Sequence, residues 1–319
     1  MTKILVTGAT GQIGSELTLV LREKHGGENV VAAGHKKSPH PRLAETGPFV
    51  TLDVTDRAQL EKVVREYSIT EIYHLAAILS ASGEQNPGLA WRVNMEGLYN
   101  VLEVAREAGI SRIFWPSSIA VFGPKTPKEN TPQDTILSPT TMYGITKVAG
   151  ELLCEYYHRR YGLDVRGLRF PGIISSETPP GGGTTDYAVE IFYAAVRGEP
   201  YTCFVRPDTV LPMMYMPDCL KATLLLMEAD PRCLRYRIYN VTGLSFSAEE
   251  LAKEIQKRVP GFRVEYKPDF RQAIADSWPR TIDDSAARAD WGWKPDYDLP
   301  KMVEAMLKAL RRRKERGEL

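Results

Sequence analysis

The chain has 319 residues, of which 43% are hydrophobic and 25% are charged, and this composition excludes disordered, collagen-like and low-complexity proteins. With 41 lysines and arginines against 40 aspartates and glutamates, the formal net charge of +1 argues against a protein built to bind nucleic acid. The sequence shows neither a membrane-length apolar run nor a signal-peptide pattern, and its four cysteines lack paired spacing. We therefore expect a cytoplasmic protein with reduced thiols.

Strands and helices alternate through the first half of the chain. Short apolar runs rich in β-branched residues predict strands, and apolar residues at helical spacing predict helices. In chain order we predict a strand at 3–7, a helix at 12–23, strands at 29–33 and 49–52, a helix around 60–67, a strand at 71–75, a helix at 93–108, a strand at 112–115, a helix at 142–161 and a strand at 165–170. This alternation predicts an α/β fold, a Rossmann-type doubly wound parallel sheet.

The alternation ends after Pro171, and residues 177–183 are almost all breakers, which predicts a loop. Beyond it we predict helices at 186–197 and 217–229, a strand at 237–241 that rejoins the sheet, a helix from a capping box at 247–250 to Val259, and a last helix from Pro300. The basic end of that helix, at 311–314, is interpreted as cations beside the carbonyl end of a helix dipole.

Three glycines separate the first predicted strand from the first predicted helix. Gly8 allows a tight turn, Gly11 lets a pyrophosphate approach the backbone, and Gly14 lets helix and strand pack closely. The helix then presents free N–H groups to phosphates. This position in the first βα unit predicts a dinucleotide site, whereas three glycines elsewhere would say little.

An acidic residue that binds the adenosine ribose of NAD is expected about 20 positions after the glycines. Gly34 stands there instead, followed by His35, Lys36 and Lys37. Lysines could bind the 2′-phosphate of NADP, or they could be ordinary solvated charges. The residues alone therefore leave NAD and NADP open, and Asp53 and Val54 are placed to meet the adenine.

Tyr143 and Lys147 share one face of a predicted helix, because they are four residues apart. An ammonium beside a phenol favours phenolate, which lowers the tyrosine pKa and lets it accept a proton from an alcohol. Ser118 follows the fifth predicted strand and is placed to hold the reacting oxygen. A glycine loop, then a serine, then tyrosine and lysine four residues apart, in this order along the chain, predict a dehydrogenase centre.

This order of motifs resembles the extended short-chain dehydrogenase/reductases over essentially the whole chain. The stretches 169–175, 180–188, 211–218 and 277–279 are similar to one branch, the short-chain-type L-threonine 3-dehydrogenases. The resemblance implies NAD-dependent oxidation of the L-threonine 3-hydroxyl to 2-amino-3-oxobutyrate. Gly34 departs from the branch, which usually has aspartate there.

The resemblance also implies roles for individual residues. Tyr143 would be the base, Lys147 would lower its pKa, and Ser118 would hold the hydroxyl. Substrate contacts would come from Ser80, Ser118, Tyr143, Thr185 and Trp278, and no metal is expected. Cofactor contacts would come from Gly8, Gly11, Gln12, Ile13, Gly14, Asp53, Val54, Leu75, Ala76, Ala77, Asn94, Tyr143, Lys147 and Phe170.

We expect residues 1–172, rejoined by 212–243, to form the NAD(P)-binding domain, and 173–211 with 244–319 to bind substrate. The loop at 177–187 is a candidate lid over L-threonine, because glycine-rich loops suit closure. Members of the resembled family are dimers built from paired helices, here 94–108 and 143–161.

Three other classes of protein are alternatives. A zinc enzyme needs clustered ligands, and the five histidines form no such pattern. A nucleotide-sugar epimerase or dehydratase of the extended superfamily would share every cofactor motif, but the 171–245 region shows no obvious basic cluster for a diphosphate. A non-catalytic NAD(P)-binding regulator would not need Ser118, Tyr143 and Lys147.

Overall fold

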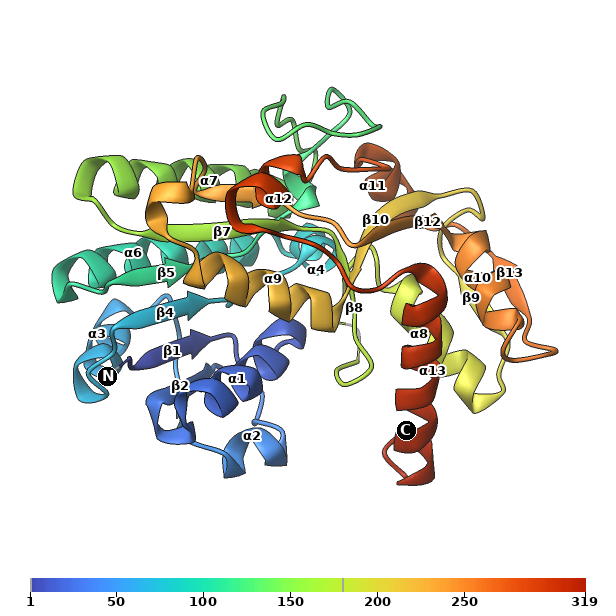
Figure 1. Cartoon of the computed structure of the whole chain (residues 1–319), viewed down its shortest axis with the longest axis horizontal. Helices are drawn as coiled ribbons and strands as arrows, with labels where there is room; N and C mark the ends of the chain where they lie inside the picture. Colours follow the sequence, from blue (N-terminus) through green and yellow to red (C-terminus); the bar gives the residue numbers. More distant parts are fainter. Residues whose placement is uncertain (1, 180) are drawn as a thin grey trace.

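The computed structural model describes residues 2–179 and 181–319 (Figure 1). Its centre is a sheet in the order β11-β7-β5-β4-β1-β2-β3, with β6 also paired to β7. The strands are β1 (Ile4–Thr7), β2 (Val30–Gly34), β3 (Phe49–Thr51), β4 (Glu71–His74), β5 (Arg112–Phe114), β6 (Ser117–Ser118), β7 (Val165–Phe170) and β11 (Ile238–Asn240). All these strands pair in parallel, which confirms the predicted doubly wound sheet.

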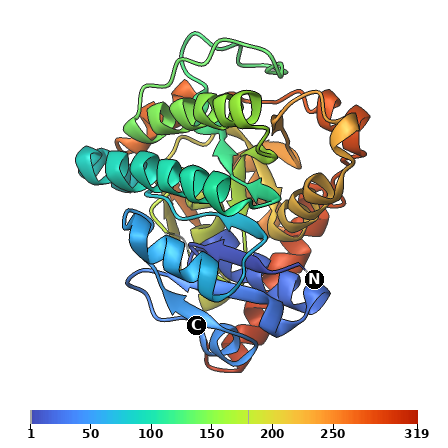
Figure 2. The same ribbon diagram turned by 90° about the vertical axis from the view of Figure 1, so that its left-hand side faces the viewer.

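Helices cover both faces of the sheet, and this agrees with the burial of every residue in β1, β2 and β7. On one face, α1 (Gln12–His25) and α9 (Met216–Glu228) pack over a buried cluster, with the short α2 (Pro41–Glu45) beside α1 and α12 (Ser285–Trp291) beside β11. On the other face lie α3 (Arg57–Glu66), α6 (Gly97–Ala108) and α7 (Met142–Tyr161), over a second cluster. Figure 2 shows α6 in teal and α7 in green side by side on the surface.

The helix predicted at 93–108 is longer and less regular in the structure. It begins with α5 (Pro87–Trp91), continues through a π-helical turn (Arg92–Glu96) and ends as α6. Asn86 starts it, because its side chain accepts a hydrogen bond from the Leu89 amide and Pro87 needs no amide partner there. A short helix, α4 (Ser80–Gln85), precedes it and was not predicted.

A smaller region stands beside the sheet, to its right in Figure 1. It holds two small sheets, β12-β10-β8 and β13-β9. Its strands are β8 (Gly172–Ile174), β9 (Tyr201–Cys203), β10 (Val210–Tyr215), β12 (Leu244–Ser247) and β13 (Val264–Tyr266), and its helices are α8 (Tyr187–Arg197), α10 (Ala248–Gln256), α11 (Arg271–Ser277) and α13 (Leu299–Glu315). The predicted capping box is present at Ser247 and Glu250, but α10 ends at Gln256 instead of Val259.

Residues 177–179 and 181–183 form neither helix nor strand, which agrees with the predicted loop, and Pro180 lies outside the described residues. The strand predicted at 237–241 is β11, and it does rejoin the sheet beside β7. None of the described helices has the length and apolar character needed to cross a membrane.

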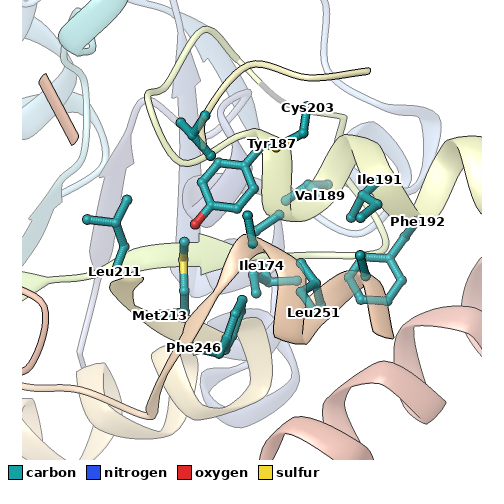
Figure 3. Packing of buried hydrophobic residues seen from close by; sticks show 14 of the residues in the cluster. Ile174, Tyr187, Val189, Ile191, Phe192, Cys203, Leu211, Met213, Phe246 and Leu251 are labelled. Carbon is teal, nitrogen blue, oxygen red and sulfur yellow. The ribbon is translucent and has the colours of Figure 1, made fainter. Parts of the chain in front are cut away.

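The core of the smaller region gathers apolar side chains from α8, β10, β12 and α10 (Figure 3). Tyr187 is fully buried there, and its hydroxyl points toward Leu211 and Met213 in the close-up. That hydroxyl has no hydrogen-bond partner among the described residues. The smaller region therefore contains a buried polar atom within an apolar cluster.

Candidate active site

The three glycines form a backbone cradle between β1 and α1. Gly8 has a φ of 69°, and a Cβ atom on it would lie 2.7 Å from the Ala76 nitrogen. A Cβ atom on Gly14 would lie 2.2 Å from the Gly8 oxygen, so only glycine fits there. Gly11 is exposed at the start of α1, whose first turn holds no acidic residue. The N-terminal amides of α1 are therefore free to bind a phosphate, and the cradle fits a dinucleotide.

The cradle opens into a cleft with about 1050 Å³ of empty space, which includes space open to solvent. The cleft lies at the carboxyl ends of the central strands, beside the switch in strand order between β1 and β4. Most of the predicted site residues line it together, namely Gly8, Gly11, Gln12, Ile13, Gly14, Leu75, Ala77, Phe170, Ser80, Ser118, Tyr143, Lys147, Thr185 and Trp278. Residues from both the large sheet and the smaller region therefore converge on one site.

Some predicted cofactor residues lie outside the cleft lining. Asn94 accepts a hydrogen bond from the Ile78 amide at 2.8 Å and donates to the Ile78 oxygen and to Thr146 Oγ1 at 3.1 Å each. Its side chain therefore ties the cleft wall to α7. Ala76 supports the turn at Gly8 through its backbone. Val54 is buried against Gly97, where a Cβ atom would lie 2.7 Å from Val54 Cγ2.

The end of β2 has little room for a side chain. A Cβ atom on Gly34 would lie 2.8 Å from Thr10 Cγ2 and 3.1 Å from Phe49 Cζ. Asp53 follows the neighbouring β3, and its Oδ2 lies 3.5 Å from His35 Nε2. Partial burial acts to raise the pKa of Asp53, but hydrogen bonds from Thr55 and the nearby basic side chains lower it overall. A carboxylate is therefore present at this edge, supplied from β3.

Tyr143 and Lys147 lie in the first two turns of α7, as predicted. Thr141 caps this helix by accepting a hydrogen bond from the Gly144 amide at 3.1 Å. Lys147 is 4% exposed, and its Nζ donates to the Pro116 oxygen at 2.5 Å. The same Nζ lies 5.5 Å from the centre of the Tyr143 ring and 4.5 Å from that of Trp115. The ammonium, the phenol and the segment before Ser118 are therefore adjacent.

Burial has the largest effect on the pKa values of Tyr143 and Lys147. It raises the pKa of Tyr143 to about 12, and the contact with the Ser118 hydroxyl acts in the opposite direction. It lowers the pKa of Lys147 to about 7, against the nearby charges of Cys154 and Glu151. Burial of Tyr143 acts in the direction opposite to the effect expected from the Lys147 charge, and that expected effect stays a prediction.

The substrate side of the cleft carries small hydroxyls and one carboxylate. Ser80 Oγ and Thr184 Oγ1 lie 3.2 Å apart, which joins α4 to the loop before α8. Asp186 lines the cleft and accepts hydrogen bonds from the amides of Gly182 and Gly183 at 2.9 and 2.7 Å. Burial raises the pKa of Asp186. The sequence analysis did not select Asp186, although its place between three glycines and a helix could have indicated a loop-fixing residue.

His74 and the cysteines have structural environments. His74 is buried, its Nδ1 lies 2.7 Å from Thr7 Oγ1, and burial together with the Lys147 charge lowers its pKa to about 3. Cys154, Cys203 and Cys219 are buried and Cys233 is exposed, all as free thiols. Within residues 2–179 and 181–319, no group of three or more His, Cys, Asp or Glu side chains could hold a metal ion.

The sequence analysis also missed a buried ion pair behind Ser118. Glu151 in α7 and Arg169 in β7 are 18 residues apart, and Arg169 Nη2 donates to Glu151 Oε2 at 2.8 Å. Neither residue belongs to a motif with a fixed spacing, so only the folded chain shows that they meet.

A glycine cradle at the switch point of an open parallel sheet is the architecture of NAD(P)-binding α/β proteins. Residues 4–242 match the profile of the NAD dependent epimerase/dehydratase family, and the chain belongs to this family. It is 51% identical over 306 residues to the mitochondrial L-threonine 3-dehydrogenase of Bos taurus. The aligned residues cover 96% of this chain and 82% of the bovine chain.

Two solved structures show the same likeness. A GalE-like L-threonine dehydrogenase from Cupriavidus necator, in its holo form, is 55% identical with a TM-score of 0.94, over 97% of this chain and 99% of that chain. A monomeric L-threonine 3-dehydrogenase from a metagenome database is 52% identical with a TM-score of 0.93, again over 97% and 99%.

Proposed function

We propose that the protein oxidises the 3-hydroxyl of L-threonine to give 2-amino-3-oxobutyrate, with NAD as the oxidant. The observation that carries this proposal is the convergence of Ser118, Tyr143 and Lys147 with Ser80 and Trp278 in one cleft beside the glycine cradle. The likeness to proteins named L-threonine dehydrogenases, at about half of all positions and over nearly the whole chain, supports it.

In this proposal Tyr143 is the general base that takes the proton of the substrate hydroxyl. Ser118 holds the reacting oxygen by a hydrogen bond, and the Lys147 ammonium favours the phenolate form of Tyr143. The nicotinamide ring of the cofactor, when bound, supplies the hydride acceptor. Gly8, Gly11 and Gly14, with the amides of α1, would hold the pyrophosphate.

NAD is proposed over NADP because Asp53 supplies a carboxylate beside the end of β2, where a 2′-phosphate would be repelled. NADP is the alternative, and it would depend on Lys36 and Lys37, which are exposed just beyond Gly34. The adenine is proposed to lie near Asp53 and Val54.

We also propose that residues 1–172 with 212–243 bind the cofactor, and that 173–211 with 244–319 bind the substrate. The loop at 177–187, of which Pro180 is not described, is proposed to close over L-threonine. The small hydroxyls of this side suit a compact zwitterion, whereas the amides of Gly182 and Gly183 already donate to Asp186. A cytoplasmic location remains a prediction.

A homodimer is proposed through the outer surface of α6 and α7. Leu152 and Tyr156 of α7 are 67% and 51% exposed, Tyr161 is exposed with its ring centre 6.0 Å from that of Tyr156, and Tyr99 of α6 is exposed as well. A patch of large apolar side chains on a protein surface typically marks an interface with another protein. The relative named as monomeric makes the oligomeric state a separate test from the activity.

The experiment that tests the activity follows absorbance of the reduced nicotinamide with L-threonine and either NAD or NADP. Reduction of NAD supports the proposal. Reduction of NADP alone would assign NADP as the cofactor, with Lys36 and Lys37 as the site of its 2′-phosphate. Reduction with neither would contradict it, and a thermal shift with UDP-glucose would then test the epimerase or dehydratase alternative. Cofactor binding without turnover of either substrate class would favour a regulatory protein.

A further inference from the structure

Two successive turns of α7 hold the short segment that carries Ser118. Tyr143, Lys147 and Glu151 share one helix face, because they are spaced by four residues. Lys147 Nζ donates to the Pro116 oxygen at 2.5 Å, and the Ser117 hydroxyl donates to Glu151 Oε1 at 2.5 Å. Consecutive residues of the segment are thus bonded to consecutive turns of the helix. Ser118 is the next residue, and its hydroxyl meets Tyr143.

Glu151 is itself held in a fixed orientation. Arg169 donates to both of its oxygens, from Nε at 2.9 Å and from Nη2 at 2.8 Å, and both side chains are 8% exposed. The remaining guanidinium nitrogen, Nη1, donates to the Gln133 oxygen at 2.9 Å and to Asn240 Oδ1 at 3.1 Å. A two-point bond of this kind fixes the plane of the carboxylate as well as its distance. The carboxylate is therefore rigidly oriented behind the active site.

Glu151 also contributes negative charge near Lys147. The ionisable groups that face Lys147 are Tyr143, Glu151 and Cys154 on its own helix and His74 at the end of β4, with the Trp115 ring stacked against it. His74 is neutral near pH 7, since burial and the Lys147 charge lower its pKa to about 3. Burial acts against the ammonium, and the charge of Glu151 acts in its favour.

We infer that Glu151 is a positioning residue, which fixes Ser118 against Tyr143 through Ser117 and places a carboxylate one helical turn beyond the Lys147 ammonium. The inference rests on the proposed dehydrogenase function. Glu151 contacts none of the reacting atoms in this scheme, and its influence passes through Ser117 and Lys147.

The first test removes the bond between Ser117 and Glu151 with Ser117→Ala, which leaves the ion pair with Arg169 intact. We expect kcat to fall about tenfold or more, because small misplacements of a catalytic group are costly, while KM and NAD affinity stay within about twofold. Ser138→Ala is the matched control, since that buried hydroxyl has no partner among the described residues. Equal kcat values for the two variants, or a loss of NAD affinity parallel to the loss of kcat, would overturn the inference.

The second test removes the charge of Glu151. Glu151→Gln alone leaves Arg169 buried without its counter-charge and is expected to unfold. The double variant Glu151→Gln with Arg169→Gln keeps a complementary amide pair instead. In protein labelled with [13C]lysine, with the signal assigned through Lys147→Arg, the NMR titration midpoint of Lys147 should fall by about one pH unit. An unchanged midpoint in a folded double variant would rule out the electrostatic role.

The proposed dehydrogenase function and the proposed role of Glu151 can be contradicted separately. Lys147 titrates without any substrate, so the NMR result stands even if wild-type protein does not oxidise L-threonine. If the wild type is active, the limb of kcat that rises with pH near neutrality should move to higher pH in the double variant, because more of Lys147 is deprotonated there and no longer favours the phenolate. An active wild type with an unmoved limb and an unmoved Lys147 titration would remove the inference and leave the activity intact.

Discussion

The Ser175 hydroxyl donates a hydrogen bond to the Glu16 carboxylate at 2.5 Å, joining the loop after β8 to the second turn of α1. Burial raises the pKa of Glu16 to about 7, with smaller opposing contributions from the Ser175 bond and Arg313 and a further rise from Glu177. Tyr215 and Cys219 also face this carboxylate. The helix that carries the phosphate cradle is thus linked to the candidate lid by a group that titrates near neutrality.

Glu16→Gln should flatten the dependence of stability on pH. The folded state binds this proton more tightly than the unfolded state, so the stability it gives is full at low pH and is lost as pH rises through about 7. Compared with the wild type, the variant should gain about 2 to 3 kcal/mol between about pH 4 and pH 8. Urea unfolding at several pH values measures this gain, and parallel curves for the two proteins would contradict it.

Tyr143→Phe should abolish turnover and keep cofactor binding. Loss of a general base typically costs about 10² to 10⁴ in rate, whereas the glycine cradle proposed to hold the cofactor is untouched. Tyr156→Phe is a matched control, since that tyrosine lies on the exposed side of the same helix. Steady-state kinetics and NAD titration by fluorescence give the two readouts. Retained turnover in Tyr143→Phe would assign the base elsewhere.

Tyr187→Phe should stabilise the protein by about 1 kcal/mol, because the buried hydroxyl gives up hydration without gaining a partner. Tyr201→Phe, in the same cluster, should do the opposite, since the Tyr201 hydroxyl donates to Glu190 at 2.9 Å. Thermal denaturation of both variants makes the comparison. Destabilisation of equal size in the two would mean that the Tyr187 hydroxyl has a partner in solution.

Leu152→Glu should disrupt the proposed dimer, because a carboxylate would be buried in an apolar interface. Light scattering after size exclusion should show monomers for this variant and dimers for the wild type. Lys308→Gln, an exposed change on α13, lowers the net charge by the same single unit and serves as the control. A monomeric wild type would contradict the dimer while leaving the chemistry unaffected.

Arg313→Ala should loosen the candidate lid. Arg313 Nη1 donates to the oxygens of Ser176 and Glu177, the latter at 3.0 Å, and to the Tyr193 hydroxyl at 3.3 Å. The basic end of α13 therefore fastens the start of the loop, a role that the interpretation as dipole-stabilising cations did not include. Hydrogen exchange at the amides of 176–178 should rise, and KM for L-threonine should increase several-fold. Arg312→Ala, exposed at the neighbouring position, should leave both unchanged.

Structural features that depend on a few neighbouring residues could be predicted from the sequence. The bounds of α7 agree with the prediction, because the cap at Thr141 and the glycine at 162 both lie next to the helix they limit. The capping box at Ser247 is a second example. The glycine cradle also matches its prediction, since its sterics depend on one strand and one helix.

Features made by distant residues could not be predicted. Strand β13 has three residues and exists because it pairs with β9, some sixty residues earlier. Asn94 is predicted to contact the cofactor, which stays a prediction, and no local pattern predicts that its side chain bonds Ile78 and Thr146. The role of Glu151 can be recognised only from its contacts with Ser117 and Arg169, which are distant in the sequence. The residues that line the candidate active site could thus be predicted better than the hydrogen bonds and ion pair that support them.

The pairing of β7 with both β5 and β11 has a consequence for synthesis of the chain. A ribosome adds about 5 to 20 residues per second, so β7 leaves it several seconds before Ile238–Asn240 can follow. During that interval β7 presents an unpaired edge, and Arg169 lacks the Asn240 side chain that it bonds in the finished protein. Slow codons between positions 170 and 238 should therefore lower the yield of folded protein, and a nascent chain halted there should be a preferred client for chaperones.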